Sequence, residues 1–414
     1  MTLTVRTEPV AEDRPLLDLL PSTPDALAWV RDGEGLVAWG TAHRLDPGPG
    51  PDRFERARAA LEALARDSVV VDEVARPGSG LVAVGSFSFD AADPGSVVVV
   101  PRVVIGRRDG VTWRTDVTVT GAPPPPAAAT GPTRSPRHDR PRYAGSSLPD
   151  VHWLEAVARA VTRIQAGEAD KVVLARDHAV WSREPFDALD LARRLTARFP
   201  RCHTFVVDGL VGATPELLLA KRGRTVTSRV LAGTTGRSTD EAEDAALGAA
   251  LLASAKDLAE HAYAATSVSE VLAPRCADLH GDPGPRLLRL DNVQHLATTY
   301  RGHLDDPTTS VLDLVGALHP TAAVGGTPRD VALKMIAELE GMSRGRYAAP
   351  VGWVNADGDG EWGIALRCAE LQGARARLFA GVGVVAASLP EAELEETRLK
   401  LLAMQAALGA DPTG

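Results

Sequence analysis

The feature that most restricts how this chain folds is a series of short apolar runs, rich in β-branched residues and bounded by charged or turn residues. Runs of about four to eight such residues are typical of strands buried in a sheet. Two of them begin beside a charged residue, Lys171-Val-Val-Leu-Ala-Arg176 and Glu216-Leu-Leu-Leu-Ala220. Strands are also predicted at residues 35–39, 81–89, 97–100, 351–354, 361–367, 376–380 and 381–385, and an antiparallel meander at 202–208, 209–212 and 217–221.

Segments with helical periodicity lie between groups of these strands. Residues 149–166 place Trp153, Val157 and Ile164 on one face, and Gly167 suits the end of a helix. Further helices are predicted at residues 54–65, 186–199, 239–272, 311–318, 327–340 and 390–406. Groups of strands that alternate with groups of helices, in place of a strict strand–helix–strand repeat, predict an α+β fold built in layers.

The composition of the chain changes between residues 121 and 148, where four consecutive prolines, an alanine run and many Ser and Arg residues follow one another. Such a stretch is typical of an exposed linker or long loop. We therefore expect an N-terminal part over residues 1–120, a linker over residues 121–148 and a catalytic region over residues 149–410.

Charge and composition argue against several classes of partner. The 414 residues carry a net charge of −9 without a block of Lys or Arg, which disfavours nucleic acid. No run of about 18 apolar residues occurs, so no membrane span is expected. The first residues lack a charged segment followed by an apolar one, so we expect a cytoplasmic location. Three scattered cysteines predict neither a disulfide framework nor a zinc site.

Lys171 and Glu216 are the main catalytic candidates, because each stands at the start of a predicted core strand. A base and an acid placed at two strand ends can move protons on a bound substrate. A lysine acts as a base only while its amine is neutral, and a carboxyl acts as an acid only while it is protonated. Burial favours both uncharged forms.

Two groups of carboxylates are candidate metal ligands. Asp257 and Glu260 share one face of a predicted helix. The start of the last helix carries Glu391, Glu393, Glu395 and Glu396. Acids at a helix N-terminus are favoured by the helix dipole, and acidic solvated faces are common, so no metal is required to explain them. Two helices that each offer carboxylates are also how a hard cation such as Mg²⁺ is held.

Arg367 is a candidate for binding an anion, because it stands in the apolar run Ile364-Ala-Leu-Arg367-Cys-Ala369. A buried guanidinium needs a partner, which is either an acid of the same chain or the carboxylate of a ligand. Glycines at Gly381-Val-Gly383 and Gly233 would let backbone N–H groups approach an anion. Gly381-Val-Gly383 is no dinucleotide fingerprint, and no P-loop, HExxH, GxSxG or CxxC pattern occurs.

Taken together, seven motifs resemble those of the chorismate-utilising enzymes, in the order of that family. They are Lys171-Val-Val-Leu-Ala-Arg176, Thr214-Pro-Glu216-Leu-Leu218, Leu231-Ala-Gly233-Thr-Thr235, Lys256-Asp-Leu-Ala-Glu260-His261, Leu318-His-Pro-Thr-Ala-Ala-Val-Gly-Gly326, Ile364-Ala-Leu-Arg367-Cys368 and Pro390-Glu-Ala-Glu393-Leu-Glu-Glu396-Thr397. The resemblance covers roughly residues 150–405. It implies a four-layer α/β/β/α sandwich of two antiparallel sheets, completed by residues 1–120, with the active site in a cleft between the sheets.

The same resemblance implies a Mg²⁺-dependent enzyme that acts on chorismate. Lys171 matches the base that activates water for attack on ring C2, and Glu216 matches the acid that protonates the departing C4 hydroxyl. Glu260 and Glu396, with Glu393 nearby, match the Mg²⁺ ligands. The residues that match positions at the substrate are Gly233, Thr234, His295, Ala323, Val324, Tyr347, Arg367, Gly381 and Lys400.

Two motifs point to one branch of the family. Lys171 and the segment His319-Pro-Thr-Ala-Ala-Val324 are similar to isochorismate synthases, especially those of menaquinone biosynthesis. Anthranilate synthases, which use ammonia, usually carry Gln in place of Lys171, and aminodeoxychorismate synthases carry Pro-Gly-Gly-Ser in the second motif. Salicylate synthase is the alternative, since it shares the base and acid and adds elimination of pyruvate. Val324 is smaller than the leucine of some siderophore-type relatives, so a lyase activity stays open.

A chorismate-binding homologue without activity is a third alternative. Such relatives normally lose the base, the acid or a metal ligand, and all of these are present here. Menaquinone and catecholate-siderophore routes both begin with isochorismate, so the sequence leaves the pathway open. A monomer is expected.

Overall fold

The structure is a computed structural model that describes residues 2–121, 123, 141–290 and 293–409. Most of the predicted linker, at residue 122 and residues 124–140, lies outside the described residues. The last part of that segment is described and contains strand β8 (Arg142–Tyr143), which pairs antiparallel with β9 (Lys171–Trp181). This end of the predicted linker is therefore part of the β-structure.

One sheet, called here the first sheet, is antiparallel throughout and carries β9 near its edge. Its strands, in the order of their pairing, are β17 (Gly326–Thr327), β9, β21 (Arg375–Val384), β20 (Cys368–Gln372), β11 (Leu210–Thr214), β10 (His203–Val207), β2 (Leu27–Arg31), β3 (Glu34–Leu45) and β6 (Val97–Arg108).

The second sheet is also antiparallel and meets the first at β6. Its strands, from the outer edge inward, are β14 (Cys276–Gly281) and β15 (Arg286–Arg289), both paired with β16 (Val293–Leu304), then β13 (Thr225–Gly236), β12 (Leu217–Arg222), β19 (Gly360–Ile364), β18 (Pro350–Asn355), β5 (Val82–Ser86) and β6. Strand β6 also pairs with β7 (Val111–Val119), which leads to β1 (Leu3–Pro9) and the parallel strand β4 (Val69–Asp72).

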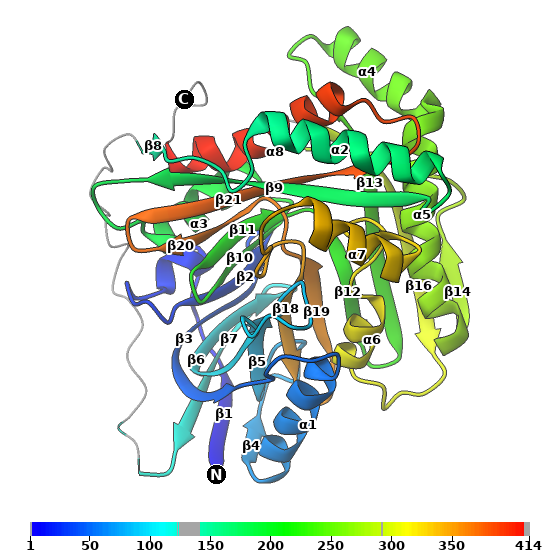
Figure 1. Cartoon of the computed structure of the whole chain (residues 1–414). Coiled ribbons are helices and arrows are strands. Elements are labelled where there is room, and N and C mark those ends of the chain that lie inside the picture. Colours follow the sequence, from blue (N-terminus) through cyan, green and yellow to red (C-terminus); the bar gives the residue numbers. More distant parts are fainter. Residues whose placement is uncertain (1, 122, 124–140, 291–292, 410–414) are drawn as a thin grey trace.

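Helices cover the outer faces of both sheets, as Figure 1 shows. The helices against the first sheet are α2 (Asp150–Gln165), α3 (Ala188–Arg198) and α8 (Pro390–Leu408). Those on the side of the second sheet are α1 (Arg53–Arg66), α4 (Glu241–Ala253), α5 (Ala255–Leu272) and α6 (Val311–Leu318). Helix α7 (Arg329–Leu339) packs on β9 and β17, and two short 3-10 helices occur at Leu16–Leu19 and Ala273–Arg275. The expected α+β sandwich of helices, two antiparallel sheets and helices is confirmed.

Side chains alternate between the two faces of each strand, so the strands contribute to two separate cores. In β10, Phe205 and Val207 face the core between the sheets, whereas Val206 faces the core under α3 and α8. Phe87 packs against Trp362 across the inner core, with ring centroids 5.4 Å apart. The three cysteines, Cys202, Cys276 and Cys368, are buried. No helix among the described residues is long and apolar enough to cross a bilayer.

Several predicted elements differ from the structure. The helix predicted over residues 239–272 is two helices, because Ser254 ends α4 and caps α5 by accepting from the N–H of Asp257. The two strands predicted at 376–380 and 381–385 are one strand, β21. The predicted meander holds for β10 and β11, but β12 pairs with β13 and β19 instead of β11. Pro215, which has no N–H to donate, separates β11 from β12. The division at residues 120 and 149 stays a prediction.

Candidate active site

A pocket opens where the two sheets meet the middle of α8, and it encloses about 600 Å³ including its opening to solvent. Segments that are far apart in the sequence line it, from β9 to α8. The structure brings most of the predicted site residues to its wall, namely Glu216, Gly233, Thr234, Glu260, His295, Ala323, Val324, Tyr347, Arg367, Gly381 and Lys400. Lys171, Glu393 and Glu396 do not line it directly.

Lys171 lies beneath the pocket and contacts it through Glu260. It is the first residue of β9, and its side chain is completely buried. Its Nζ lies 3.2 Å from Oε1 of Glu260 and donates to the backbone carbonyl of the same residue at 3.4 Å. A Cβ at Gly383 would come within 2.1 Å of Glu260 Oε1 and 2.9 Å of Lys171 Cε. The pair therefore fits against β21 only because residue 383 is glycine.

Glu216 enters the pocket where the chain crosses from one sheet to the other. It lies between β11, which pairs in the first sheet, and β12, which pairs in the second. Burial raises the pKa of its carboxyl from 4.5 to about 8, against a backbone hydrogen bond from Leu231 and the charges of Lys171 and Arg367. The carboxyl is therefore protonated at neutral pH, which is the state that an acid requires.

Arg367 does not lie in a strand, contrary to the expectation from its apolar surroundings. Strand β19 ends at Ile364, and Arg367 has a φ of 49°, in the left-handed region. Its Nη2 donates to Nε2 of His295 at 3.4 Å, and among the described residues no carboxylate forms an ion pair with it. The described residues thus give no support to the internal salt bridge, and the carboxylate of a ligand stays the other candidate partner of Arg367.

A chain of hydrogen bonds fixes the tautomer of His295. Because Nε2 accepts from Arg367, Nδ1 carries the proton and donates to Oγ1 of Thr234 at 3.0 Å. Burial, with the charges of Arg367 and Lys400, holds the pKa of His295 well below its usual value, so the ring is neutral. Thr234 faces His295 after a break in the β13–β16 register at Gly233, whose φ is 77°.

Tyr347, Gly381 and Lys400 form the wall near α8. The Tyr347 ring stacks on Phe379 with centroids 4.9 Å apart, and burial raises the pKa of its hydroxyl, which keeps it a proton donor. A Cβ on Gly381 would lie 3.1 Å from that hydroxyl. Lys400 Nζ donates to the Gly381 carbonyl at 2.8 Å and lies 2.6 Å from Glu396 Oε1. The wall thus offers a hydroxyl and an ammonium group.

The three predicted metal ligands are each paired with a lysine. Glu260 pairs with Lys171, Glu396 with Lys400, and the buried Glu393 with Lys256 at 2.5 Å.

Lys256 marks a place that favours a cation. Burial acts to lower its pKa, but Glu393, Glu396 and Glu260 outweigh burial, and the pKa is raised. Carboxylates from two helices therefore surround one ammonium group, and these hard oxygen donors suit Mg²⁺. Among the residues that the structure describes, no three acidic, His or Cys side chains are already gathered as a metal cluster. The donor set fits Mg²⁺ once these carboxylates turn from their lysines.

Sequence reasoning missed Arg344, which lines the pocket and fixes two of its segments. Its buried guanidinium pairs with Glu340 and donates to the carbonyls of Val173 and Val324, both at 2.8 Å. The spacing of Glu340 and Arg344, four residues apart, was the available signal. Lys256 was also missed, although its motif was noted.

Glu216→Gln tests the burial of the carboxyl. In the wild type, the protonated Glu216 carboxyl contributes to stability below pH 4.5, and this contribution is lost as the pH rises toward 8. In that window the carboxyl ionises only in the unfolded chain, which favours unfolding. Urea unfolding should show Glu216→Gln gaining a few kcal/mol over wild type at pH 8 relative to pH 4.5, at roughly 1.4 kcal/mol per pKa unit. The exposed Glu241→Gln should show no such gain. An equal effect of Glu216→Gln at both pH values would contradict the buried acid.

Gly383→Ala tests the fit of the Lys171–Glu260 pair against β21. The added methyl group would displace both side chains, so unfolding should be easier by about 1–3 kcal/mol in urea titrations. Gly236→Ala is the matched control, because Gly236 also lies at a strand and its Cβ would meet nothing within 4 Å. Equal stability of the two variants would show that the pair does not depend on glycine.

Comparison with known proteins agrees with this geometry. Residues 27–409 match the family model described as chorismate binding enzyme. The isochorismate synthase DhbC of Bacillus subtilis is 39% identical over 298 residues, which are 68% of this chain and 75% of that protein. The salicylate biosynthesis isochorismate synthase of Pseudomonas aeruginosa is 36% identical over 413 residues, or 93% of this chain and 85% of that protein.

A solved structure extends the similarity to three dimensions. The menaquinone-specific isochorismate synthase MenF of Escherichia coli superposes with a TM-score of 0.81 at 25% identity, covering 98% of this chain and 94% of that chain. The match of the family model runs from β2 to the end of α8. The chain belongs to the chorismate-binding enzyme family.

Proposed function

We propose that this protein is an isochorismate synthase, which converts chorismate to isochorismate with Mg²⁺. Water adds at ring C2, the C4 hydroxyl leaves as water after protonation, and the ring double bonds shift, so substrate and product have the same composition. The observation that carries the proposal is one pocket lined by a protonated glutamic acid and by an arginine to which the described residues offer no carboxylate partner, with a buried lysine directly behind Glu260 of its wall. These groups supply a base, an acid and an anion site.

Proton transfer is the role we propose for Lys171 and Glu216. Lys171 takes a proton from the attacking water, which requires that its amine first lose the proton it shares in the ion pair with Glu260, while Glu216 gives its proton to the departing C4 hydroxyl. The two residues enter from different segments, β9 and the β11–β12 crossing, and their charges influence each other. After turnover Lys171 is protonated and Glu216 is ionised, so a net proton passes back through solvent before the next cycle.

Binding of the enolpyruvyl carboxylate is the role we propose for Arg367 and Tyr347, with the Gly381 backbone nearby. A guanidinium fork fits a carboxylate in a bidentate manner. His295, held as a neutral acceptor by Thr234, orients the guanidinium.

The ring of the substrate would lie against the apolar Ala323 and Val324, with Gly233 and Lys400 completing the wall.

Glu260 and Glu396 would hold Mg²⁺, with Glu393 nearby. When bound, the ion supplies charge neutralisation at the ring carboxylate of chorismate. Glu260 is the ligand candidate that both lines the pocket and contacts Lys171. The proposed metal site and the base would therefore both depend on Glu260. We expect the enzyme to act as a cytoplasmic monomer. Its relatives are named for menaquinone and for salicylate biosynthesis, so both routes are open to its product.

A product assay tests the proposal. Purified protein incubated with chorismate and Mg²⁺ should form isochorismate alone, resolved by chromatography. Lys171→Ala should stop its formation while the protein keeps a cooperative melting transition. Salicylate and pyruvate as products would replace the proposal by salicylate synthase, and no turnover would support an inactive binding homologue.

Glu260→Gln tests the metal site without turnover. Titration calorimetry with MgCl₂ should show binding at least tenfold weaker, or about 1.4 kcal/mol, because a neutral amide is a poorer ligand for a hard cation. The control is Glu270→Gln, which changes an exposed acid of the same helix. If both variants bind Mg²⁺ like wild type, Glu260 is not a ligand.

A further inference from the structure

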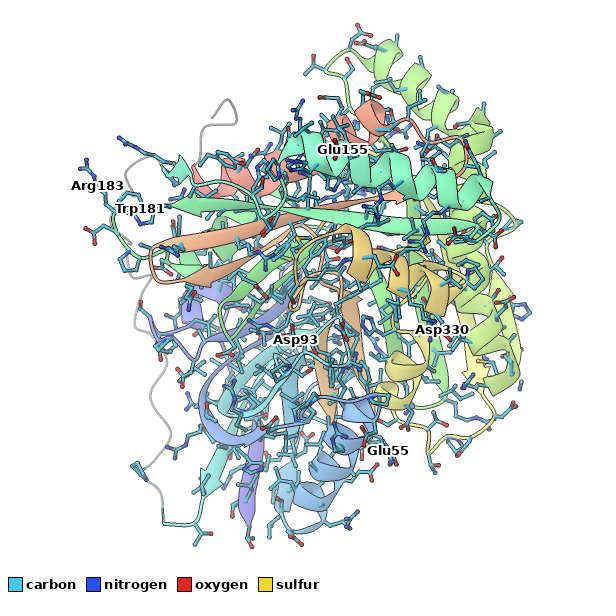
Figure 2. The ribbon with its side chains drawn as sticks, viewed as in Figure 1. Glu55, Asp93, Glu155, Trp181, Arg183 and Asp330 are labelled. Carbon is cyan, nitrogen blue, oxygen red and sulfur yellow. The ribbon has the colours of Figure 1, made fainter. Side chains whose placement is uncertain are left out.

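A second cavity, which encloses about 1700 Å³ including its opening to solvent, lies between α1, the 89–94 segment and α7. In Figure 2, Glu55, Asp93 and Asp330 mark these three segments. The cavity shares a single described residue, Arg344, with the wall of the catalytic pocket. None of the substrate-binding roles proposed above uses a residue of this second cavity.

Two of the three arginines in the cavity wall, Arg53 and Arg329, are the groups that could hold an anion. Arg53 is only 4% exposed, and among the described residues its Nη atoms donate to the carbonyls of Gly50 and Ser88, both at 3.2 Å. Its Nε is buried without a hydrogen-bond partner. Arg329 likewise donates to the carbonyls of Ala317 and Leu318. Within the described part of the chain neither guanidinium forms an ion pair, so both charges are available to an anion.

The acids around the cavity are engaged elsewhere. Glu340 pairs with Arg344. Asp93 accepts hydrogen bonds from Ser343 and Gly95, and Asp90 is exposed and accepts from the N–H of Ala92. Asp90 acts on Arg53 only through space. The three acids balance the three arginines of the wall in formal charge, but among the described residues none of these acids contacts Arg53 or Arg329 directly.

Apolar side chains that suit a ring form a large part of the rest of the wall, alongside His319 and Ser343. They include Phe54, Phe89, Pro320, Leu333, Ile336 and Met342. The Arg53 guanidinium lies 4.7 Å from the centroid of Phe54, and the Arg344 guanidinium 4.2 Å from that of Phe89. Apolar walls with a few convergent polar groups are typical of small-molecule sites. We propose that this cavity binds a small ring compound that bears a carboxylate, with Arg53 and Arg329 holding the carboxylate.

The wall between the two cavities connects this ligand to the catalytic strand. Residues 319–320 line the second cavity, and Ala323 and Val324 of the same loop line the catalytic pocket. Glu340 accepts from the N–H of Ala175 in β9 at 2.7 Å, four residues from Lys171. A ligand in the second cavity therefore contacts elements that position the base, while leaving the chorismate site open.

Binding of sodium 1-naphthoate, followed by titration calorimetry on the full chain, tests the site. Naphthoate should bind with and without saturating chorismate, and the neutral 1-naphthamide should bind at least tenfold more weakly. Arg53→Met and Arg329→Met should each weaken naphthoate at least tenfold. Arg66→Met changes an exposed arginine at the other end of α1 and should leave binding unchanged.

Three results would overturn the proposal: no binding of naphthoate, equal binding of naphthamide, or wild-type affinity in both Arg53→Met and Arg329→Met. Displacement by chorismate together with loss of binding in Arg367→Met would assign the ligand to the catalytic pocket. If Arg53→Met fails to fold by circular dichroism, Ala337→Phe on the rim should block binding instead. These outcomes do not depend on turnover, so failure of the proposed function would leave them interpretable.

Discussion

The antiparallel pairing of β9 with β21 is the constraint on which the site depends. The two strands pair over ten residues, from Arg375 opposite Trp181 to Val384 opposite Val172. This register sets Gly383 beside Lys171 and Glu260, and Gly381 beside Tyr347 and Lys400. Because strand spacing is nearly fixed, a side chain at either glycine would have to displace a functional group. The two glycines therefore leave space for the side chains that approach them. At Gly381 the backbone carbonyl, and not the N–H, makes the observed contact, which is a hydrogen bond from Lys400.

Burial of charged groups is the second physical theme of the site. Lys171, Lys256 and Lys400 each have a carboxylate within ion-pair distance, so their charges are compensated in this arrangement. Among the described residues Glu216 has no such partner, and burial holds it in its protonated form. A carboxyl held protonated by burial is what a general acid requires, and structural ion pairs alone would not leave one carboxyl neutral.

The sequence predicted the fold well where hydrophobic periodicity was strong. The core strands β9, β12 and β18 and helices α2, α6 and α8 stand where their patterns placed them. Strands β13 and β16 were not predicted, because polar and charged residues such as Arg229 and Arg301 interrupt their apolar positions. The long helix predicted at 239–272 hid a break, since a serine is tolerated in a helix but also caps one.

The residues of the site likewise divide into those that the sequence predicted and those that depend on the tertiary fold. Its residues were predicted through motifs, and the structure brings most of them to one pocket. The spacing of Glu340 and Arg344 could have indicated their ion pair, but not the role of Arg344 in the site, because its contacts with Val173 and Val324 join segments that only the tertiary fold brings together. The strand position expected for Arg367 was wrong because an apolar run does not reveal a left-handed residue. Ion pairs such as Glu393 with Lys256, from α8 and α5, likewise depend on helix packing.

The central claim is that Lys171 delivers water to ring C2 while Glu216 assists loss of the C4 hydroxyl. Turnover of chorismate in oxygen-18 water, followed by mass spectrometry of the isochorismate formed, tests it most directly. The account predicts one solvent oxygen in each product molecule, located at C2, with the original C4 oxygen released to solvent. Isochorismate that retains the original hydroxyl oxygen would show an internal transfer of the hydroxyl group and would contradict the account.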